Sequence, residues 1–269
     1  MKKLTRIYVL LCLVFLALLA VSGSLSGLAS ILLYISAFLA PCALGLYFVK
    51  KEWGGINLPI GKIKNVRLIL PLVCPALLLI FAISYITSLI IHLLGGADSS
   101  VTLYGSAALD VIYNAALPAL LEESLFRLLP LLLIAPYSKR GALAVSTLCF
   151  AFAHVSLHSI PYALFAGAVF FASDLLGESV WPSVILHFIN NAISLLWIYN
   201  SQSPEFCVIY ILILSILSVL SLVLIFKRRK EYAKAIKDSF LCSEDKSIPQ
   251  ETLFFIVPTL ILAITNILS

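Results

Sequence analysis

The sequence contains few charged residues. Only 12% of its 269 residues are Asp, Glu, Lys or Arg, and 62% are hydrophobic, whereas a soluble domain is about a quarter charged and about half apolar. A water-soluble core cannot absorb this excess, so most of the chain must face lipid or other lipid-buried segments. The shortage of charge therefore excludes a large soluble domain and predicts a single all-α membrane domain.

Two common metal and redox motifs are also missing. The six cysteines include no Cys-x-x-Cys pair, and the four histidines include no His-Glu-x-x-His motif. The cysteines are therefore expected to be small buried apolar residues. A formal net charge of +5 is too mild to predict nucleic-acid binding.

Nine apolar runs, separated by charged or turn-forming clusters, are candidate membrane spans. They are 7–22, 27–49, 68–94, 107–135, 141–158, 160–176, 180–199, 205–226 and 252–268. The sequence thus predicts a polytopic helix bundle with about eight to nine spans. The first run is short and the last contains Pro258, so these two are the least typical spans. The first run also resembles a signal peptide that ends at 20–22, although the many later runs favour an uncleaved anchor.

The basic residues are unevenly placed. Every one of the 18 Lys and Arg residues except Arg127 falls in a loop on one side of the predicted bundle. With the N-terminus inside, the inner loops are 1–6, 50–67, 136–140, 177–179 and 227–251. This positive-inside pattern predicts a cytoplasmic N-terminus in a multi-pass cell-membrane protein, of a kind typical of the bacterial cytoplasmic membrane. Residues 227–240 are expected to form either a short helix on the inner leaflet or a solvated loop.

Three groups of polar residues lie inside the central runs, where a charge costs about 3 kcal/mol. They are Glu122, Glu123 and Arg127; His154; and His187 with Asn191. Glu123 and Arg127 are four residues apart, so they share a helix face and can form an ion pair. Glu122 is turned about 100° away, which leaves its carboxylate available as a general base.

The predicted depths of these residues agree. At about 1.5 Å per residue, Glu122 and His154 lie about 20 Å from the inner ends of their spans, His187 about 12 Å and Asn191 about 18 Å. An acid, two imidazoles and an amide are therefore expected to converge near the middle of the membrane.

The sequence predicts the roles of several other polar and proline residues less specifically. Pro118 and Pro130 flank the acidic pair and are expected to kink or widen that helix and to admit water. Asn114 is a candidate for the lining of the same cavity, and Asn190 is expected to pack or hydrogen-bond between helices. The residues expected to be solvated or interfacial at span ends are His92, Asp110, His158, Asp174 and Glu178.

Three segments, EESLFR, FAFAH and HFINN, carry a family resemblance. They resemble the Glu-Glu-x-x-x-Arg, Phe-x-x-x-His and His-x-x-x-Asn motifs of the CPBP family, the CAAX-protease and bacteriocin-processing proteins formerly called Abi. The motifs occur in this order on successive predicted helices, within about residues 105–200. Leu128 departs from the glycine that commonly follows the arginine. The resemblance implies that Glu123 and Arg127 hold the first of these helices in place.

The same resemblance implies an intramembrane endopeptidase, because the family includes the eukaryotic Ras-converting endoprotease that trims prenylated CAAX proteins. Glu122 would activate the hydrolytic water with help from His154, and His187 and Asn191 would stabilise the oxyanion. Peptide hydrolysis needs a base, a proton donor for the leaving amine and donors for the oxyanion. The residues of this chain supply each of these groups.

Zinc is the open alternative within the same function. Glu122, His154 and His187 form a possible ligand set, with water in the fourth position. Family members are often described as metalloproteases, whereas the relation to the Ras-converting enzyme points to a glutamate mechanism. We favour metal-free chemistry and leave the cofactor undecided.

The favoured function is cleavage of a peptide or membrane-protein tail. The alternatives are a non-catalytic membrane scaffold or bacteriocin-immunity factor and, with less support because the chain has no internal repeat, a proton-coupled transporter. The expected partners are the substrate and the lipid bilayer, without nucleic acid. The chain divides into N-terminal spans 1–100, a catalytic core 101–200 and C-terminal spans 201–269 with the basic loop 227–251.

Overall fold

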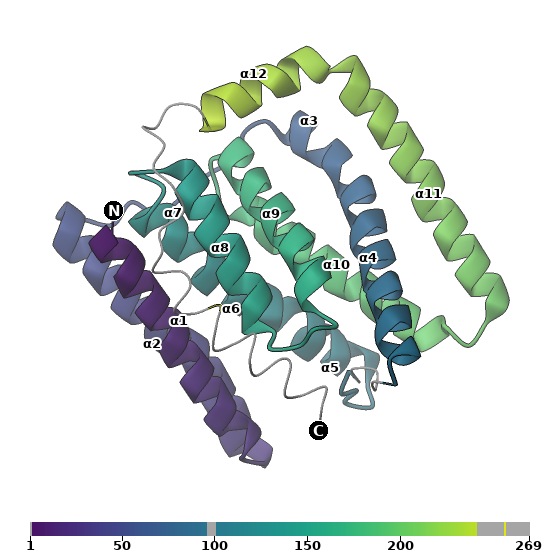
Figure 1. The fold of residues 1–269 in the computed structure, drawn as a ribbon, viewed down its shortest axis with the longest axis horizontal. Helices are drawn as coiled ribbons and strands as arrows, with labels where there is room; N and C mark the ends of the chain where they lie inside the picture. Colours follow the sequence, from purple (N-terminus) through teal and green to yellow (C-terminus); the bar gives the residue numbers. More distant parts are fainter. Residues whose placement is uncertain (1, 96–100, 241–255, 257–269) are drawn as a thin grey trace.

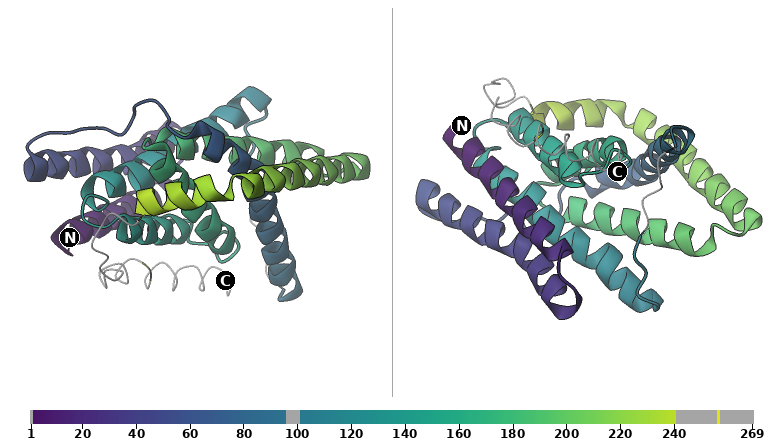
Figure 2. Two further views of the ribbon diagram at one scale, coloured as in Figure 1. Left: turned by 90° about the horizontal axis from the view of Figure 1, so that it is seen from above. Right: turned by 60° about the horizontal axis from the view of Figure 1, so that its bottom comes forward.

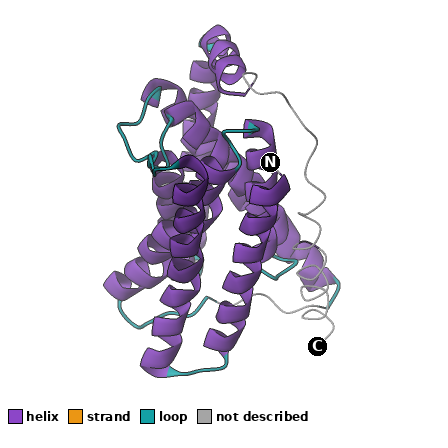
Figure 3. Cartoon of the chain, turned by 90° about the vertical axis from the view of Figure 1, so that its left-hand side faces the viewer, coloured by secondary structure: helices purple, strands orange, loops and turns teal. Residues whose placement is uncertain are grey.

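Helices account for every regular element in the part of the chain that the structure describes, which confirms the all-α prediction (Figure 3). The structure is a computed structural model that describes residues 2–95, 101–240 and 256. The predicted span 252–268 therefore lies, apart from one residue, outside the described residues.

Six described stretches are long and apolar enough to cross a bilayer. They are α1 (Lys2–Gly23), α2 (Gly27–Trp53), the continuous α3–η1–α4 stretch (Val66–Ile69, Leu70–Leu72 and Val73–Leu93), α9 (Ile160–Gly177), α10 (Trp181–Asn200) and α11 (Pro204–Lys227). Each corresponds to one predicted apolar run. A total of eight to nine spans stays a prediction.

The predicted span 107–135 is a continuous helical run in which two turns are widened. Its parts are α5 (Ala107–Val111), the π-helical turn η2 (Ile112–Ala116), α6 (Leu117–Glu123), the π-helical turn η3 (Ser124–Leu128) and α7 (Leu129–Leu133). Each wide turn comes just before a proline, Pro118 or Pro130. Proline has no N–H for the carbonyl four residues earlier, which explains why the α pattern fails there. The predicted widening of this helix is confirmed.

One carbonyl released by this irregularity finds a partner on another helix. The Phe126 carbonyl lies four residues before Pro130 and accepts a hydrogen bond from the hydroxyl of Ser146 in α8 (Lys139–Ala153). Both groups are buried, so this bond satisfies a polar atom that would otherwise be costly at this depth.

Helix α8 is shorter than the predicted span 141–158, and that prediction is wrong at its C-terminal end. The helix has 15 residues, a length of about 22 Å against a hydrocarbon core of about 30 Å. Residues 154–159 form an irregular turn in which Val155 has φ +48°. The chain reverses there so that α9 can return along α8.

The helices surround the α8–α9 pair. The α1–α2 hairpin packs on one side of the bundle, and α4 packs with α11 on the other (Figure 1). Two further views show the same separation (Figure 2). Helix α12 (Arg229–Phe240) returns from α11 across one end of the bundle to contact α8 and α9. Residues 227–240 were expected to form either a short helix or a solvated loop, and the structure shows a helix at Arg229–Phe240.

The basic loops that were assigned to one side of the membrane contact one another in pairs. Lys3 forms an ion pair with Glu52 (3.6 Å), Lys64 pairs with Glu178 (2.7 Å), and Arg67 pairs with Glu231 (3.5 Å). These contacts place the chain start, the loop after α2, the α9–α10 turn and α12 at the same end of the bundle.

The loop after α2 also fixes the start of α10. Backbone N–H groups of Lys64 and Val180 donate to the carbonyls of Gly177 (2.9 Å) and Pro59 (2.8 Å), respectively. The indole of Trp181 donates to the Ile60 carbonyl (3.1 Å). Because α10 carries His187 and Asn191, this loop determines where the site residues of that helix stand.

Two acids predicted to be solvated are buried, and those predictions are wrong. Asp110 is 0% exposed and Asp174 is 1% exposed. Asp174 accepts a hydrogen bond from the N–H of Ser183 (2.8 Å), in the first turn of α10. Such N–H groups have no partner within their own helix, so a neighbouring carboxylate satisfies them. Glu178 is exposed, as predicted.

Candidate functional site

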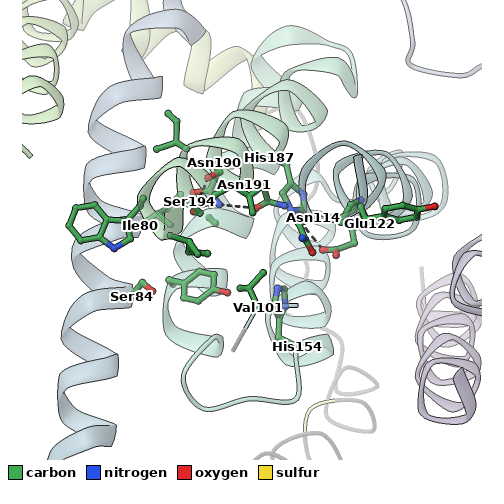
Figure 4. A pocket seen from close by; sticks show the side chains of 18 of the residues that line it. Ile80, Ser84, Val101, Asn114, Glu122, His154, His187, Asn190, Asn191 and Ser194 are labelled. Atoms are coloured by element: carbon green, nitrogen blue, oxygen red, sulfur yellow. Dashed lines mark hydrogen bonds and ion pairs between the residues drawn. The ribbon is translucent and has the colours of Figure 1, made fainter. Parts of the chain in front are cut away.

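A cavity of about 880 Å³ opens among α2, α4, the 107–133 run, the turn after α8 and α10. Glu122, His154, His187 and Asn191 all line it (Figure 4). The structure thus brings together four residues from three separate helical segments. Asn114, a weaker candidate for the cavity lining, also lines it.

The two adjacent glutamates have different environments. The Glu122 side chain is 19% exposed and lines the cavity, whereas the Glu123 side chain is 0% exposed. Neighbouring positions on a helix point about 100° apart, so only one of the two carboxylates can reach the cavity. Glu122 is therefore the acid that a water molecule in the cavity can contact.

Glu123 is the centre of a buried charge cluster. Its Oε2 lies 3.1 Å from Nε of Arg127, which is the predicted ion pair. Its Oε1 lies 2.7 Å from Nδ1 of His187. The Arg127 guanidinium also stacks over the Phe150 ring at 4.2 Å from its centroid. These contacts offset part of the cost of burying both charges. Among the described residues, Oε2 of Glu123 and the three guanidinium nitrogens of Arg127 are buried without a hydrogen-bond partner.

The contact between Glu123 and His187 was not predicted from the sequence. A carboxylate only accepts hydrogen bonds, so Nδ1 of His187 carries the hydrogen and donates it. The other ring nitrogen, Nε2, lies 4.0 Å from Oε2 of Glu122. At that separation one water molecule can hydrogen-bond to both atoms. The rings of Phe150 and Phe170 flank the imidazole.

His154 stands at the C-terminal end of α8. Its Nδ1 donates to the Phe150 carbonyl, one turn earlier (2.9 Å), because a carbonyl can only accept. Because Nδ1 is used in this bond, Nε2 is the ring nitrogen that can interact with groups in the cavity. The ring packs edge-on against Phe150 and against Tyr162 of α9, which fixes its orientation.

The two asparagines of α10 act as a pair. Nδ2 of Asn190 donates to Oδ1 of Asn191 (3.1 Å), and both residues line the cavity. The bond orients the Asn191 amide so that its Nδ2 is the group left to donate into the cavity. Asn190 thus bonds along its own helix, whereas a bond or packing contact between helices was expected.

Several cavity residues were missed at the sequence level. Phe81, Trp197 and Tyr210 form an aromatic wall, with ring centroids 4.8 to 5.5 Å apart. His158, expected to be interfacial, lines the cavity and is hydrogen-bonded to Ser88. Aromatic residues are common in every apolar run of this sequence, so no local signal distinguished these positions.

The arrangement does not fit a three-ligand zinc site. Within residues 2–95 and 101–240, no three or more His, Cys, Asp and Glu side chains are grouped to hold a metal ion. Glu122 and His187 approach each other, but His154 does not join them in such a group, and Nδ1 of His187 is bonded to Glu123. A catalytic zinc site usually has three protein ligands. The alternative set of Glu122, His154 and His187 is therefore not assembled in this geometry.

Comparison with known proteins supports the family resemblance over the core of the chain. Residues 104–193, about one third of the chain, match the family described as Rce1-like, type II CAAX prenyl endopeptidase. The matched segment contains all three motifs, so the resemblance is confirmed there. No curated protein and no solved structure matches the chain. The family match and the apolar helices support a multi-pass membrane protein that is a protease in general terms.

Proposed function

We propose that this chain is an intramembrane endopeptidase of the CPBP type, in which Glu122 activates water to cleave a peptide or a membrane-protein tail. The observation that carries this proposal is the 4.0 Å approach of Glu122 Oε2 to Nε2 of His187 inside the cavity. A water molecule held by both groups faces a space large enough for an extended peptide. Such a position suits general-base attack on a carbonyl carbon.

The proposed reaction begins when the Glu122 carboxylate removes a proton from this water as its oxygen attacks the scissile carbonyl. The C–O bond forms and the carbonyl electrons move to its oxygen, which becomes an oxyanion. The C–N bond then breaks and the nitrogen takes the proton that Glu122 had removed from water, either directly from Glu122 or passed on through Nε2 of His154. The products are a free carboxylate and a free amine.

The oxyanion is stabilised in this proposal by donors from α10. Nδ2 of Asn191 is one donor, because the amide oxygen is already bonded to Asn190. His187 is the second when both its ring nitrogens carry hydrogen, since Nε2–H then points into the cavity. Glu123 behind the ring orients it and balances its charge, in the manner of the carboxylate of a hydrolase triad.

We infer a cytoplasmic N-terminus from the placement of the basic residues, and a bacterial cytoplasmic membrane from the shortness of the chain. The support for the cytoplasmic N-terminus is the contact between the basic segments, since Arg67 pairs with Glu231 and Arg228 donates to the Arg67 carbonyl (2.8 Å). Loops that meet at one end of the bundle lie on the same side of a membrane, where Lys and Arg accumulate on the cytoplasmic face.

The experiment is a cleavage assay with the purified protein in proteoliposomes and a mixture of synthetic peptides, with products read by mass spectrometry. Glu122→Gln and His154→Ala are each expected to lower cleavage about 100-fold or more. Matched controls are Glu52→Gln and His92→Ala, two exposed positions away from the cavity. Unchanged cleavage in both site variants would remove the proposal and favour a non-catalytic membrane protein.

A further inference from the structure

One wall of the cavity comes from a segment that mostly precedes the family match. Residues 101–105, here called the strap, form no regular secondary structure and end at Gly105, which has φ +76°. Val101, Thr102 and Tyr104 line the cavity. Val101 and Thr102 lie before residue 104, where the matched segment begins. This wall is therefore a feature of this chain that the family match does not cover.

The strap is held by a buried carboxylate. Oδ1 of Asp110 accepts the backbone N–H of Tyr104 (2.7 Å) and Nδ2 of Asn114 (3.3 Å). The same Asn114 group donates to the Thr102 carbonyl (3.0 Å). Oδ2 of Asp110 accepts the hydroxyl of Tyr199, which belongs to α10. Asp110 thus connects the strap to the two helical segments that carry Glu122 and His187.

These contacts explain why an acid tolerates complete burial at this place. A buried carboxylate is costly unless hydrogen bonds replace its water. One of the donors, the N–H of Tyr104, is in position only when the strap lies against the helix. Asn114 belongs to the same helical run as Asp110, and it ties the strap by donating to the Thr102 carbonyl as well. The third donor comes from α10. The energetic cost of an unpaired Asp110 therefore keeps the strap in place.

Val101 is an apolar strap residue in the lining of the cavity that also holds His154 and Asn191 (Figure 4). The residue is 48% exposed, so a substrate in the cavity can contact it. A valine has no donor or acceptor in its side chain, so it can select only by shape. It occupies space that a substrate side chain beside the cleaved bond would need.

We propose that Val101 is a specificity-determining residue and that Asp110 is the positioning residue that holds it there. The inference rests on the proposed function, since specificity has meaning only if the cavity cleaves peptides. It names the substrate class as peptides with a small side chain at one position beside the scissile bond, and bulky side chains at that position are excluded by contact with Val101.

The first test measures the cleavage profile of a peptide mixture in which each position is randomised. Val101→Ala is expected to raise cleavage of peptides with Leu, Phe or Trp at one position about tenfold or more, because an apolar pocket discriminates by size on that scale. Val101→Trp is expected to lower cleavage of all but the smallest residues there. Val208→Ala and Val208→Trp, at an exposed position of α11, are the matched controls. A profile unchanged in both Val101 variants overturns the specificity role.

The second test does not depend on catalysis. Leu117 lines the cavity and is partly buried, so a Leu117→Cys variant in detergent reports access through the strap side by its rate of reaction with a charged thiol reagent. Adding Asp110→Ala is expected to speed labelling about tenfold over the background of the native cysteines, and adding the exposed control Asp238→Ala is expected to leave it unchanged. Tyr199→Phe, which removes one donor, serves as the milder variant if Asp110→Ala does not fold.

The cleavage profile and the thiol-labelling rate distinguish failure of this inference from failure of the proposed function. If neither Asp110→Ala nor Tyr199→Phe accelerates labelling, the positioning role of Asp110 on the strap is overturned. If labelling is accelerated but the protein cleaves no peptide, the proposed function is overturned, and with it the specificity role of Val101. The same result supports the role of Asp110 in holding the strap.

Discussion

The carboxylate of Glu123 accepts a hydrogen bond from Nδ1 of His187, 64 residues away in sequence, at 2.7 Å, and its other oxygen forms an ion pair with Arg127. A residue expected only to hold one helix therefore also sets the orientation of an imidazole on another. The cavity-facing acid, Glu122, and the buried acid, Glu123, share one helical turn but serve different elements. Their separation allows one carboxylate to face the cavity while the other stays buried.

Glu123→Gln is expected to destabilise the protein by about 3–5 kcal/mol, because it leaves the buried Arg127 without its counter-charge. The measurement is the midpoint of thermal unfolding in detergent. The double variant Glu123→Gln with Arg127→Met is expected to recover part of the stability but none of the cleavage, since His187 still lacks its carboxylate. A double variant no more stable than the single one would show that the ion pair is not the source of the loss.

Ser146→Ala is expected to cost about 1–3 kcal/mol, because the Phe126 carbonyl before Pro130 loses its partner while remaining buried. Unfolding by heat or by a denaturing detergent measures the loss. Ser36→Ala is the control: the Ser36 hydroxyl also bonds a carbonyl, Leu32 four residues earlier, but at an exposed position. Equal stability of the two variants would contradict the role given to Ser146.

Gly177→Ala is expected to destabilise the α9–α10 turn by about 1–3 kcal/mol. A Cβ at this position would lie 2.8 Å from the ring of Pro182 and 3.2 Å from Ile63, so the start of α10 must shift. Cleavage is expected to fall with stability, because His187 moves with the helix. Gly55→Ala, where a Cβ meets open space, is the control, and a loss of the same size there would rule out this explanation.

Treatment with a chelator such as 1,10-phenanthroline is expected to leave cleavage within about twofold of the untreated protein. The reason is geometric, because Glu122, His154 and His187 are not grouped as three ligands of one ion. Cleavage in proteoliposomes before and after chelation gives the answer. Loss of activity that added zinc restores would instead favour the metal-dependent alternative.

The sequence was informative wherever a signal is local. Apolar length predicted the long spans, the four-residue spacing of Glu123 and Arg127 predicted their ion pair, and the positions of Pro118 and Pro130 predicted the widened helix. Each of these features depends on residues within one continuous segment of the chain.

Features that depend on distant partners were missed. Ser183 of α10 donates to Asp174, and Asp110 accepts from Tyr199 of α10 and from the strap as well as from nearby Asn114. The burial of these two acids therefore has little sign in the local pattern. The end of α8 was misplaced because residues 154–159 continue an apolar run, and nothing in composition reveals the left-handed Val155. The cavity-lining role of the strap was not predicted because its sequence resembles that of an ordinary loop.

The shortness of α8 has a consequence for the water around its C-terminal end. The helix packs among other helices of the bundle, and its length of about 22 Å ends about 8 Å short of a full hydrocarbon core. Irregular backbone at membrane depth is tolerated only where protein buries it or where it lines a water-filled cavity. Because His154 at this turn lines the cavity, we expect the turn to be hydrated from the cavity, and in the proposed protease that reservoir would supply the water consumed by each cleavage.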